Sequence, residues 1–251
     1  MRLPTNIALS ALLCLFMQWQ PARGQSATPE PALAASVAAL QARYDESFPG
    51  QPQLYSGTEY VDYSKRYHAR IGHQFFLDAA PLPGSVEYDG YRHRNVALAY
   101  DLVRDKLLLT QPGSPILLQL VSERVSRFDL AGHRFVQLLP DSTAASAMRP
   151  GYYEVLVDSA SQVLAKRSKT MQQLLVNRNI DVKFSPADKL FVRRGDTYYP
   201  VSKKKAALHA FADRSKEMQQ YVQEHKLSFR KDQLEASLVL LARHYNLLAT
   251  R

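Results

Sequence analysis

Short apolar runs dominate the chain from Gly84 to Val201, and turn residues interrupt them about every 8–12 residues, as in antiparallel sheets. The clearest turn is Asp89-Gly90, between the runs Val86–Tyr88 and Tyr91–Arg94. A two-residue hairpin turn needs positive φ angles, which Asp-Gly tolerates. The spacers are too short for the helical crossovers of a parallel sheet. The sequence therefore predicts an antiparallel meander, either an open curved sheet or a partial barrel.

A helical period replaces the strand pattern after Val201. Ser202 and Asp213 are the expected N-caps of two helices, and Asp232 with Glu235 forms a capping box that opens a third. The apolar stripe of the last helix consists of Leu234, Leu238, Leu241, Tyr245 and Leu248. Such a stripe must pack on a partner. The predicted fold class is therefore α+β, an antiparallel sheet followed by a helical cap of about three helices.

The N-terminus has the pattern of a signal peptide, so we expect the protein to be exported. Arg2 precedes the apolar stretch Ile7–Met17, and Ala22-Arg23-Gly24 fits a small-x-small cleavage site. The mature chain would then lie in the periplasm, at the outer envelope or outside the cell. Lipid attachment at Cys14 is the alternative, although a leucine precedes this cysteine where a small residue is normal. After the cleavage site no run of about 18 apolar residues occurs, so no transmembrane helix is expected.

These patterns divide the chain into a signal peptide (1–24), a tether with a short helix (25–54), an antiparallel β domain (55–201) and a basic helical segment (202–251). The short helix is expected at Pro31–Tyr44, where apolar residues follow helical spacing. The only cysteine, Cys14, leaves with the signal peptide. The mature chain is therefore expected to have no disulfide and no thiolate chemistry.

Positive charge is concentrated near the C-terminus. Residues 161–251 contain 18 Lys and Arg against 8 Asp and Glu, whereas the whole chain has a net charge of +9. A basic C-terminal third indicates an anionic partner: an envelope surface, a glycan or another envelope protein. Nucleic acid is not expected for an exported protein. The alternative is that these cations only solvate the helices. The densest cationic run is Lys203, Lys204 and Lys205.

Neither a metal site nor a cofactor is predicted. Zinc needs three or four converging ligands, and no H-E-x-x-H pattern is present. The histidines that could converge are His68, His73, His93 and His133.

No catalytic residue is predicted either. The chain has no G-x-S-x-G nucleophile elbow. Five aspartates lie in expected turns, where the side chain bonds its own backbone; they are Asp89, Asp101, Asp105, Asp141 and Asp158. The Arg194-Gly195-Asp196 tripeptide resembles an adhesion motif, but a hairpin turn accounts for it.

Two tyrosine pairs are candidates for a binding surface. Tyr152-Tyr153 and Tyr198-Tyr199 place one ring on each face of a strand. In a sheet covered on one side, one tyrosine of each pair should be exposed. Exposed tyrosines suit glycan or peptide recognition. Packing against the helices is the alternative.

Several segments resemble a group of exported proteins of Bacteroidota-type bacteria that has no established activity. They are GHQFF (Gly72–Phe76), GSVEYDG (Gly84–Gly90), GYYEVL (Gly151–Leu156), YYPVSKKK (Tyr198–Lys205), YVQEHKLSFRKD (Tyr221–Asp232) and HYN (His244–Asn246). The resemblance implies export and a shared fold. It implies no catalytic residue, cofactor or ligand.

The leading hypothesis is a non-enzymatic binding or structural module of the cell envelope. It would use a β-sheet face and the basic helical cap, with the tyrosine pairs and Lys203–Lys205 as its binding surface. The alternative is a hydrolase whose site gathers the histidines and turn carboxylates at one edge of the sheet. The sequence leaves the ligand and the oligomeric state open.

Overall fold

The computed structural model describes residues 54–111, 113–139 and 148–249, together with residues 35–37, 39–40 and 43. The chain divides into two units, Met1–Gly50 and Gln51–Arg251. The described residues of the first unit are helical and fall within the expected helix Pro31–Tyr44. The predicted signal peptide lies outside the described residues. All hydrophobic clusters described below belong to the second unit.

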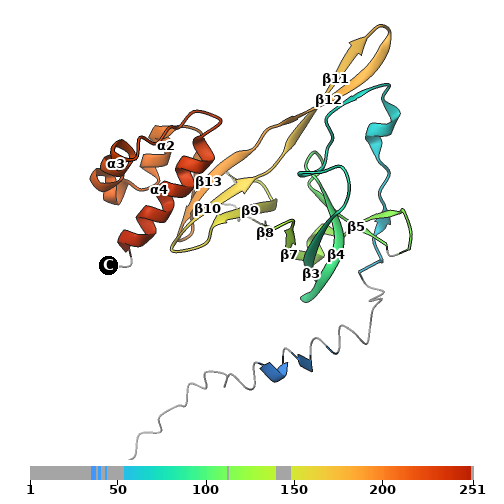
Figure 1. Ribbon diagram of the computed structural model, residues 1–251, viewed down its shortest axis with the longest axis horizontal. Helices are drawn as coiled ribbons and strands as arrows, with labels where there is room; N and C mark the ends of the chain where they lie inside the picture. Colours follow the sequence, from blue (N-terminus) through green and yellow to red (C-terminus); the bar gives the residue numbers. More distant parts are fainter. Residues whose placement is uncertain are drawn as a thin grey trace, which may run out of the picture. The chain divides into compact units, whose positions relative to one another are not determined.

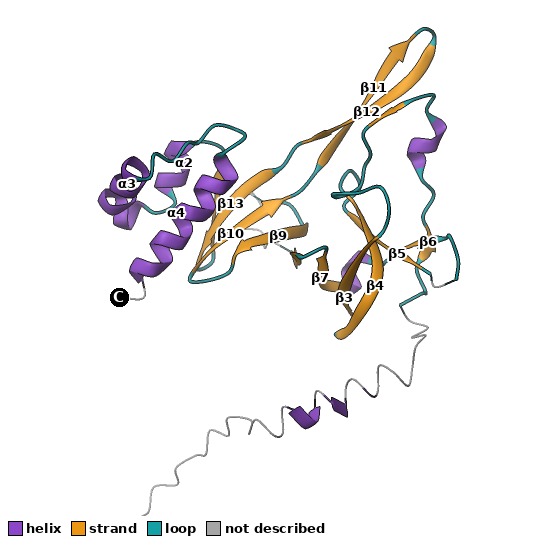
Figure 2. Ribbon diagram, in the orientation of Figure 1, coloured by secondary structure: helices purple, strands orange, loops and turns teal. Residues whose placement is uncertain are grey.

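An open sheet of 11 antiparallel strands forms the frame of this unit, in the order β1-β6-β5-β4-β3-β7-β8-β9-β10-β13-β14 (Figure 1). Its strands are β1 (Thr58–Glu59), β3 (Leu82–Tyr88), β4 (Tyr91–Asp101), β5 (Lys106–Thr110), β6 (Leu117–Gln119), β7 (Val125–Leu130), β8 (His133–Leu138), β9 (Gly151–Val157), β10 (Ser161–Lys166), β13 (Lys189–Arg194) and β14 (Thr197–Val201). The helices follow in the chain, so the predicted α+β class is confirmed (Figure 2).

A second, three-stranded sheet contains β11 (Lys169–Val176), β12 (Asn179–Pro186) and β2 (Arg70–Ile71). Most of this hairpin was not predicted from the sequence. Its turn is Asn177-Arg178, with φ angles of 49° and 67°. A turn without glycine gives a weak hairpin signal. The short β2 pairs with β12 in parallel, which departs from the expected purely antiparallel arrangement.

The predicted turn at Asp89-Gly90 is confirmed, with φ angles of 52° and 80°. The turn at Ala131-Gly132 likewise has positive φ at both residues. These turns fix the register of β3 with β4 and of β7 with β8. Register decides which side chains leave the core and become available at the surface.

The sheet curls around an aromatic core. The ring of Tyr100 on β4 lies 5.3 Å from that of Phe135 on β8 and 5.8 Å from that of Tyr152 on β9. A flat sheet would separate β4 from β9 by about 19 Å. The curl therefore buries one face of β3, β4, β7, β8 and β9 within itself.

Three helices cover the other end of the sheet: α2 (Lys204–His209), α3 (Ser215–Glu224) and α4 (Leu234–Ala249). Short 3-10 turns occur at η1 (Tyr63–Arg66), η2 (Ser122–Arg124) and η3 (Ala212–Arg214). The predicted α4 stripe is confirmed, because Leu238, Leu241 and Tyr245 are buried against β10, β13 and β14. This packing stabilises a helix that would be marginal alone.

The expected N-caps are wrong. Lys203 and Arg214 occupy the N-cap positions of α2 and α3, and neither makes a side-chain cap hydrogen bond. Asp213 instead accepts hydrogen bonds from Arg194 and Tyr245. Glu235, expected in a capping box, accepts two hydrogen bonds from Arg167. Charge-assisted tertiary bonds are stronger than neutral ones, so they compete successfully for these carboxylates.

Candidate functional site

The outer face of the curled sheet is polar where its inner face is aromatic. Ser85 on β3 is the register partner of Asp129 on β7, which in turn faces Arg134 on β8. Directly opposed residues share a face of the sheet, so these three side chains form a row across three strands. Their neighbours Val86 and Phe128 point the other way and are buried.

A β-bulge interrupts the pairing of β3 with β4 beside this row. Gly84 pairs with Val96 and Val86 pairs with His93, so two residues of β4, Arg94 and Asn95, oppose a single residue of β3. Asn95 has a positive φ of 55°. Bulges bend a strand and redirect its side chains. Here the bulge brings Arg94 and Asn95 to the same surface as Ser85.

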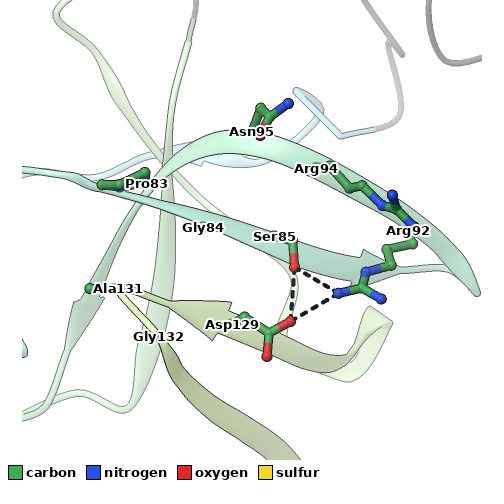
Figure 3. A pocket seen from close by; sticks show the side chains of 9 residues that line it. All are labelled: Pro83, Gly84, Ser85, Arg92, Arg94, Asn95, Asp129, Ala131 and Gly132. Carbon is green, nitrogen blue, oxygen red and sulfur yellow. Dashed lines mark hydrogen bonds and ion pairs between the residues drawn. The ribbon is translucent and has the colours of Figure 1, made fainter. Parts of the chain in front are cut away.

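The result is a shallow hollow of about 490 Å³ on the outer face (Figure 3). It is lined by Pro83, Gly84, Ser85, Arg92, Arg94, Asn95, Asp129, Ala131 and Gly132. The first three come from β3 and the next three from β4, whereas Asp129 lies on β7 and the last two form the turn before β8.

A three-residue hydrogen-bond network holds one side of the hollow. Ser85 Oγ donates to Asp129 Oδ2 over 3.0 Å, and Arg92 Nη2 donates to the same oxygen over 3.1 Å. Figure 3 shows these contacts and shows Arg94 on the same strand as Arg92. Arg94 is exposed and forms no hydrogen bond or ion pair with the residues drawn there. The hollow therefore has two guanidinium groups and one carboxylate, a net positive charge.

Polar groups continue past the hollow across β8 and β9. A second hollow of about 390 Å³ shares Asp129 and Gly132 with the first and also includes His133, Arg134, Glu154 and Asp158. Arg134 lies 3.7 Å from both Asp129 and Asp158. The two hollows thus form one polar surface over five strands.

An ion-pair network fixes the floor of the second hollow. Buried Glu154 lies 2.5 Å from His133 Nδ1 and 2.5 Å from Arg167 Nε. Arg167 also donates to Asp188 and to both carboxylate oxygens of Glu235 on α4. Burial alone would lower the pKa of Arg167, but its carboxylate partners outweigh burial and raise this pKa. Arg167 therefore remains charged and joins α4 to the sheet.

The predicted tyrosine surface is wrong for Tyr152 and Tyr153, each of which is only 1% exposed. The curl covers the face of β9 that carries Tyr152, and Met148 and Phe191 cover the face that carries Tyr153. Tyr152 lies in the aromatic core with Tyr100, and Tyr153 packs on Phe191.

The other predicted binding residues lie at the far end of the sheet. Tyr198 and Tyr199 on β14 are partly exposed. Tyr198 packs under Arg193, and Tyr199 lies against His209. Lys203, Lys204 and Lys205 are exposed around the start of α2. None of these residues lines either hollow.

The four candidate histidines have different surroundings. His68 lies 3.1 Å from Asp181 on β12, and His133 contacts Glu154. His73 stacks on Phe75, and burial followed by the charge of Lys169 lowers its pKa. His93 lies on β4. Within the described ranges, no group of three His, Cys, Asp or Glu residues is placed to hold a metal ion.

The turn aspartates have structural partners. Asp101 is fully buried and accepts hydrogen bonds from Tyr60, Tyr63 and two backbone amides. Asp89 pairs with Arg124, and Asp158 accepts from Gln162. Asp105 pairs with Lys166, whereas Asp141 lies outside the described residues. Among the described candidate histidines and turn aspartates, only His133 and Asp158 line either hollow, and both line the second.

Sequence reasoning missed the hollow. Its polar residues lie on strands of the predicted meander, but the β-bulge that brings the adjacent Arg94 and Asn95 to one surface is not visible in an alternating pattern.

Comparison of the chain with known family models, with curated proteins and with solved structures finds no match. Among the described helices, none is long and apolar enough to cross a membrane.

Proposed function

We propose that this protein is an exported, non-enzymatic binding module that holds an acidic glycan on the outer face of β3, β4, β7 and β8. The observation that carries this proposal is the exposed Arg94 beside the Ser85–Asp129–Arg92 network. A guanidinium group pairs with a carboxylate through two parallel hydrogen bonds. Arg94 is therefore suited to the carboxylate of a uronic acid.

The remaining groups of the hollow suit sugar hydroxyls. Asp129 accepts hydrogen bonds, Ser85 both donates and accepts, and the Asn95 amide does both. A sugar hydroxyl both donates and accepts hydrogen bonds, so a site that binds it needs an acceptor and a donor together. A ligand with both carboxylate and hydroxyl groups matches this set better than a simple anion, which Asp129 would repel.

The open shape favours an oligomer over a small enclosed ligand. The polar surface continues from Arg94 through Asp129 to Arg134 and Asp158. Successive sugar units can contact successive strands, which lie about 4.8 Å apart. The exposed Lys203–Lys205 run adds long-range attraction for a polyanion. The signal-peptide pattern supports export to the envelope, where such glycans occur.

The proposal assigns no catalytic step to this hollow. Ser85 donates its hydroxyl hydrogen to Asp129, and Arg92 donates to the same carboxylate oxygen. In the proposal this network positions groups that bind sugar hydroxyls.

Isothermal titration calorimetry with oligogalacturonate tests the proposal. Its methyl ester is the matched ligand, since it keeps the hydroxyls and loses the charge. We expect Arg94→Gln to weaken binding at least about tenfold, because a charged hydrogen-bonded pair is lost. Arg178→Gln removes the same charge from the β11–β12 turn and should have little effect. Equal binding of acid and ester, or equal losses in both variants, would contradict the proposal.

A further inference from the structure

The tip of the β11–β12 hairpin exposes aliphatic side chains. Leu175 is 80% exposed, Ile180 49% and Val176 43%. Leu175 and Ile180 are register partners, so they lie side by side on one face of the hairpin. Val176 occupies the opposite face, since neighbouring residues alternate along a strand. The tip therefore presents apolar groups on both faces.

The other end of the hairpin is firmly anchored. Val182 and Phe184 on β12 are buried with Tyr60, Tyr63 and Phe75. The short β2 pairs with β12 at Val182 and Lys183. Beyond this anchor the hairpin extends as an isolated pair of strands (Figures 1 and 2). A rigid base with a free apolar tip suits insertion into another phase rather than packing within this chain.

Positive charge surrounds the shaft of the hairpin. The exposed cations of the shaft are Lys65, Arg66, Arg70 and Lys183, which we call the basic collar; Arg178 is also exposed and lies in the turn at the tip. Arg66 and Gln173 both donate to the Tyr67 hydroxyl, so η1 lies beside β11. The acidic residue of the hairpin, Asp181, is mostly covered and pairs with His68. The exposed charge next to the tip is therefore cationic.

The spacing of tip and collar matches a bilayer surface. Arg70 pairs with Val182, four residues from Arg178 along β12, a separation of about 14 Å. Interfacial protein segments bury apolar groups about 5–10 Å deep. With the tip at that depth, the collar lies within about one Debye length, 8–10 Å, of anionic headgroups.

We propose that the β11–β12 tip inserts into the interfacial zone of an anionic lipid bilayer, with the basic collar contacting its headgroups. The tip is convex and has apolar side chains on both faces. A lipid bilayer can surround both faces, whereas a protein groove would cover one face. The site is separate from the glycan hollow, so either proposal can fail without the other.

Vesicle co-sedimentation of residues 51–251 tests this inference, since these residues form a compact unit with their own hydrophobic core. The vesicles contain phosphatidylcholine and phosphatidylglycerol at 3:1, with pure phosphatidylcholine as comparison. We expect binding to the anionic vesicles only. Leu175→Ser/Ile180→Ser should weaken it at least about tenfold through lost apolar burial, and Arg178→Gln/Lys183→Gln by about tenfold through lost charge. Leu247→Ser, at an exposed leucine of α4, should leave binding unchanged.

A fluorescence measurement detects insertion itself. The only tryptophan of the chain is Trp19, so residues 51–251 contain none and Leu175→Trp provides a single reporter. Its emission should shift to the blue with anionic vesicles, and brominated lipid should quench it. Absence of vesicle binding, or binding that the Leu175→Ser/Ile180→Ser variant retains in full, would overturn the proposal. Self-association lost in that variant, without vesicle binding, would identify a protein interface and would also overturn it.

Discussion

The Nζ atom of Lys166 lies 2.6 Å from Oδ2 of Asp105, which is 61 positions earlier in the chain. Lys166 ends β10, whereas Asp105 precedes β5, and five strands separate β5 from β10 in the sheet. Tyr100 donates to the other oxygen of Asp105 over 2.5 Å. Burial lowers the pKa of Lys166, and the charge of Asp105 partly opposes that effect. This ion pair therefore joins the two ends of the curl.

Lys166→Met should destabilise the protein by about 2–3 kcal/mol, since Asp105 would keep its charge without its partner in a partly buried site. Arg193→Met is the control because the acidic partner of Arg193, Asp196, lies 4.0 Å away at the surface, and a methionine can still pack on Tyr198. We expect that change to cost under about 0.5 kcal/mol. Urea unfolding measures both values. Equal losses would show that the pair does not stabilise the curl.

Gly84→Ala should disturb the hollow through a steric clash. A Cβ atom at Gly84 would overlap the backbone oxygen of Asp129 and approach Leu98. We expect a loss of about 1–3 kcal/mol in unfolding free energy, together with weaker glycan binding. Gly113→Ala is the control, since a Cβ there meets no neighbour and only the positive φ opposes it. That variant should lose about 1 kcal/mol and keep its binding. Unchanged stability of Gly84→Ala would refute the close contact.

Glu87 should contribute stability that disappears in acid. A hydrogen bond from Ser126 lowers the pKa of Glu87 below its usual 4.5, burial opposes it, and Arg127 lowers the pKa further. The folded carboxyl group therefore releases its proton more readily than the unfolded one. Its stabilisation is present above about pH 4.5 and is lost as pH falls through the folded pKa.

The corresponding test is Glu87→Gln, followed by urea unfolding at pH 7, 5 and 3. We expect the substitution to lower the free energy of unfolding by less than about 1 kcal/mol at pH 7, because the Glu87–Arg127 pair is near the surface. At pH 3 the free energy of unfolding should not fall. Glu59→Gln, an exposed change on β1, controls for the altered net charge. A loss that persists at pH 3 would mean that packing, rather than charge, is responsible.

Local signals predicted much of the fold, whereas long-range packing decided the site. The Asp89-Gly90 turn and the α4 stripe were predictable because each depends on neighbouring residues. The β11–β12 hairpin was missed since Asn177-Arg178 lacks glycine. The hollow needs the register shift at Gly84, which alternation alone does not reveal. The expected exposure of one tyrosine of the Tyr152-Tyr153 pair was wrong, because the curl covers one face of β9 and Met148 with Phe191 covers the other.

The Lys203–Lys205 run provides a test that separates binding from folding. Reversing all three to Glu should weaken oligogalacturonate binding, since the attraction of a polyanion to this end of the chain is lost. The reversal places acidic groups around the N-terminus of α2, where the helix dipole favours them. The thermal midpoint should therefore stay the same or rise while affinity falls.

Lys216→Glu reverses one exposed charge in the first turn of α3 and should change affinity much less. In salt near 1 M the Debye length falls to about 3 Å, so the triple variant and the unmodified protein should then bind alike. If oligogalacturonate binding by the unmodified protein did not change with salt, neither the Lys203–Lys205 run nor long-range attraction would contribute to recognition.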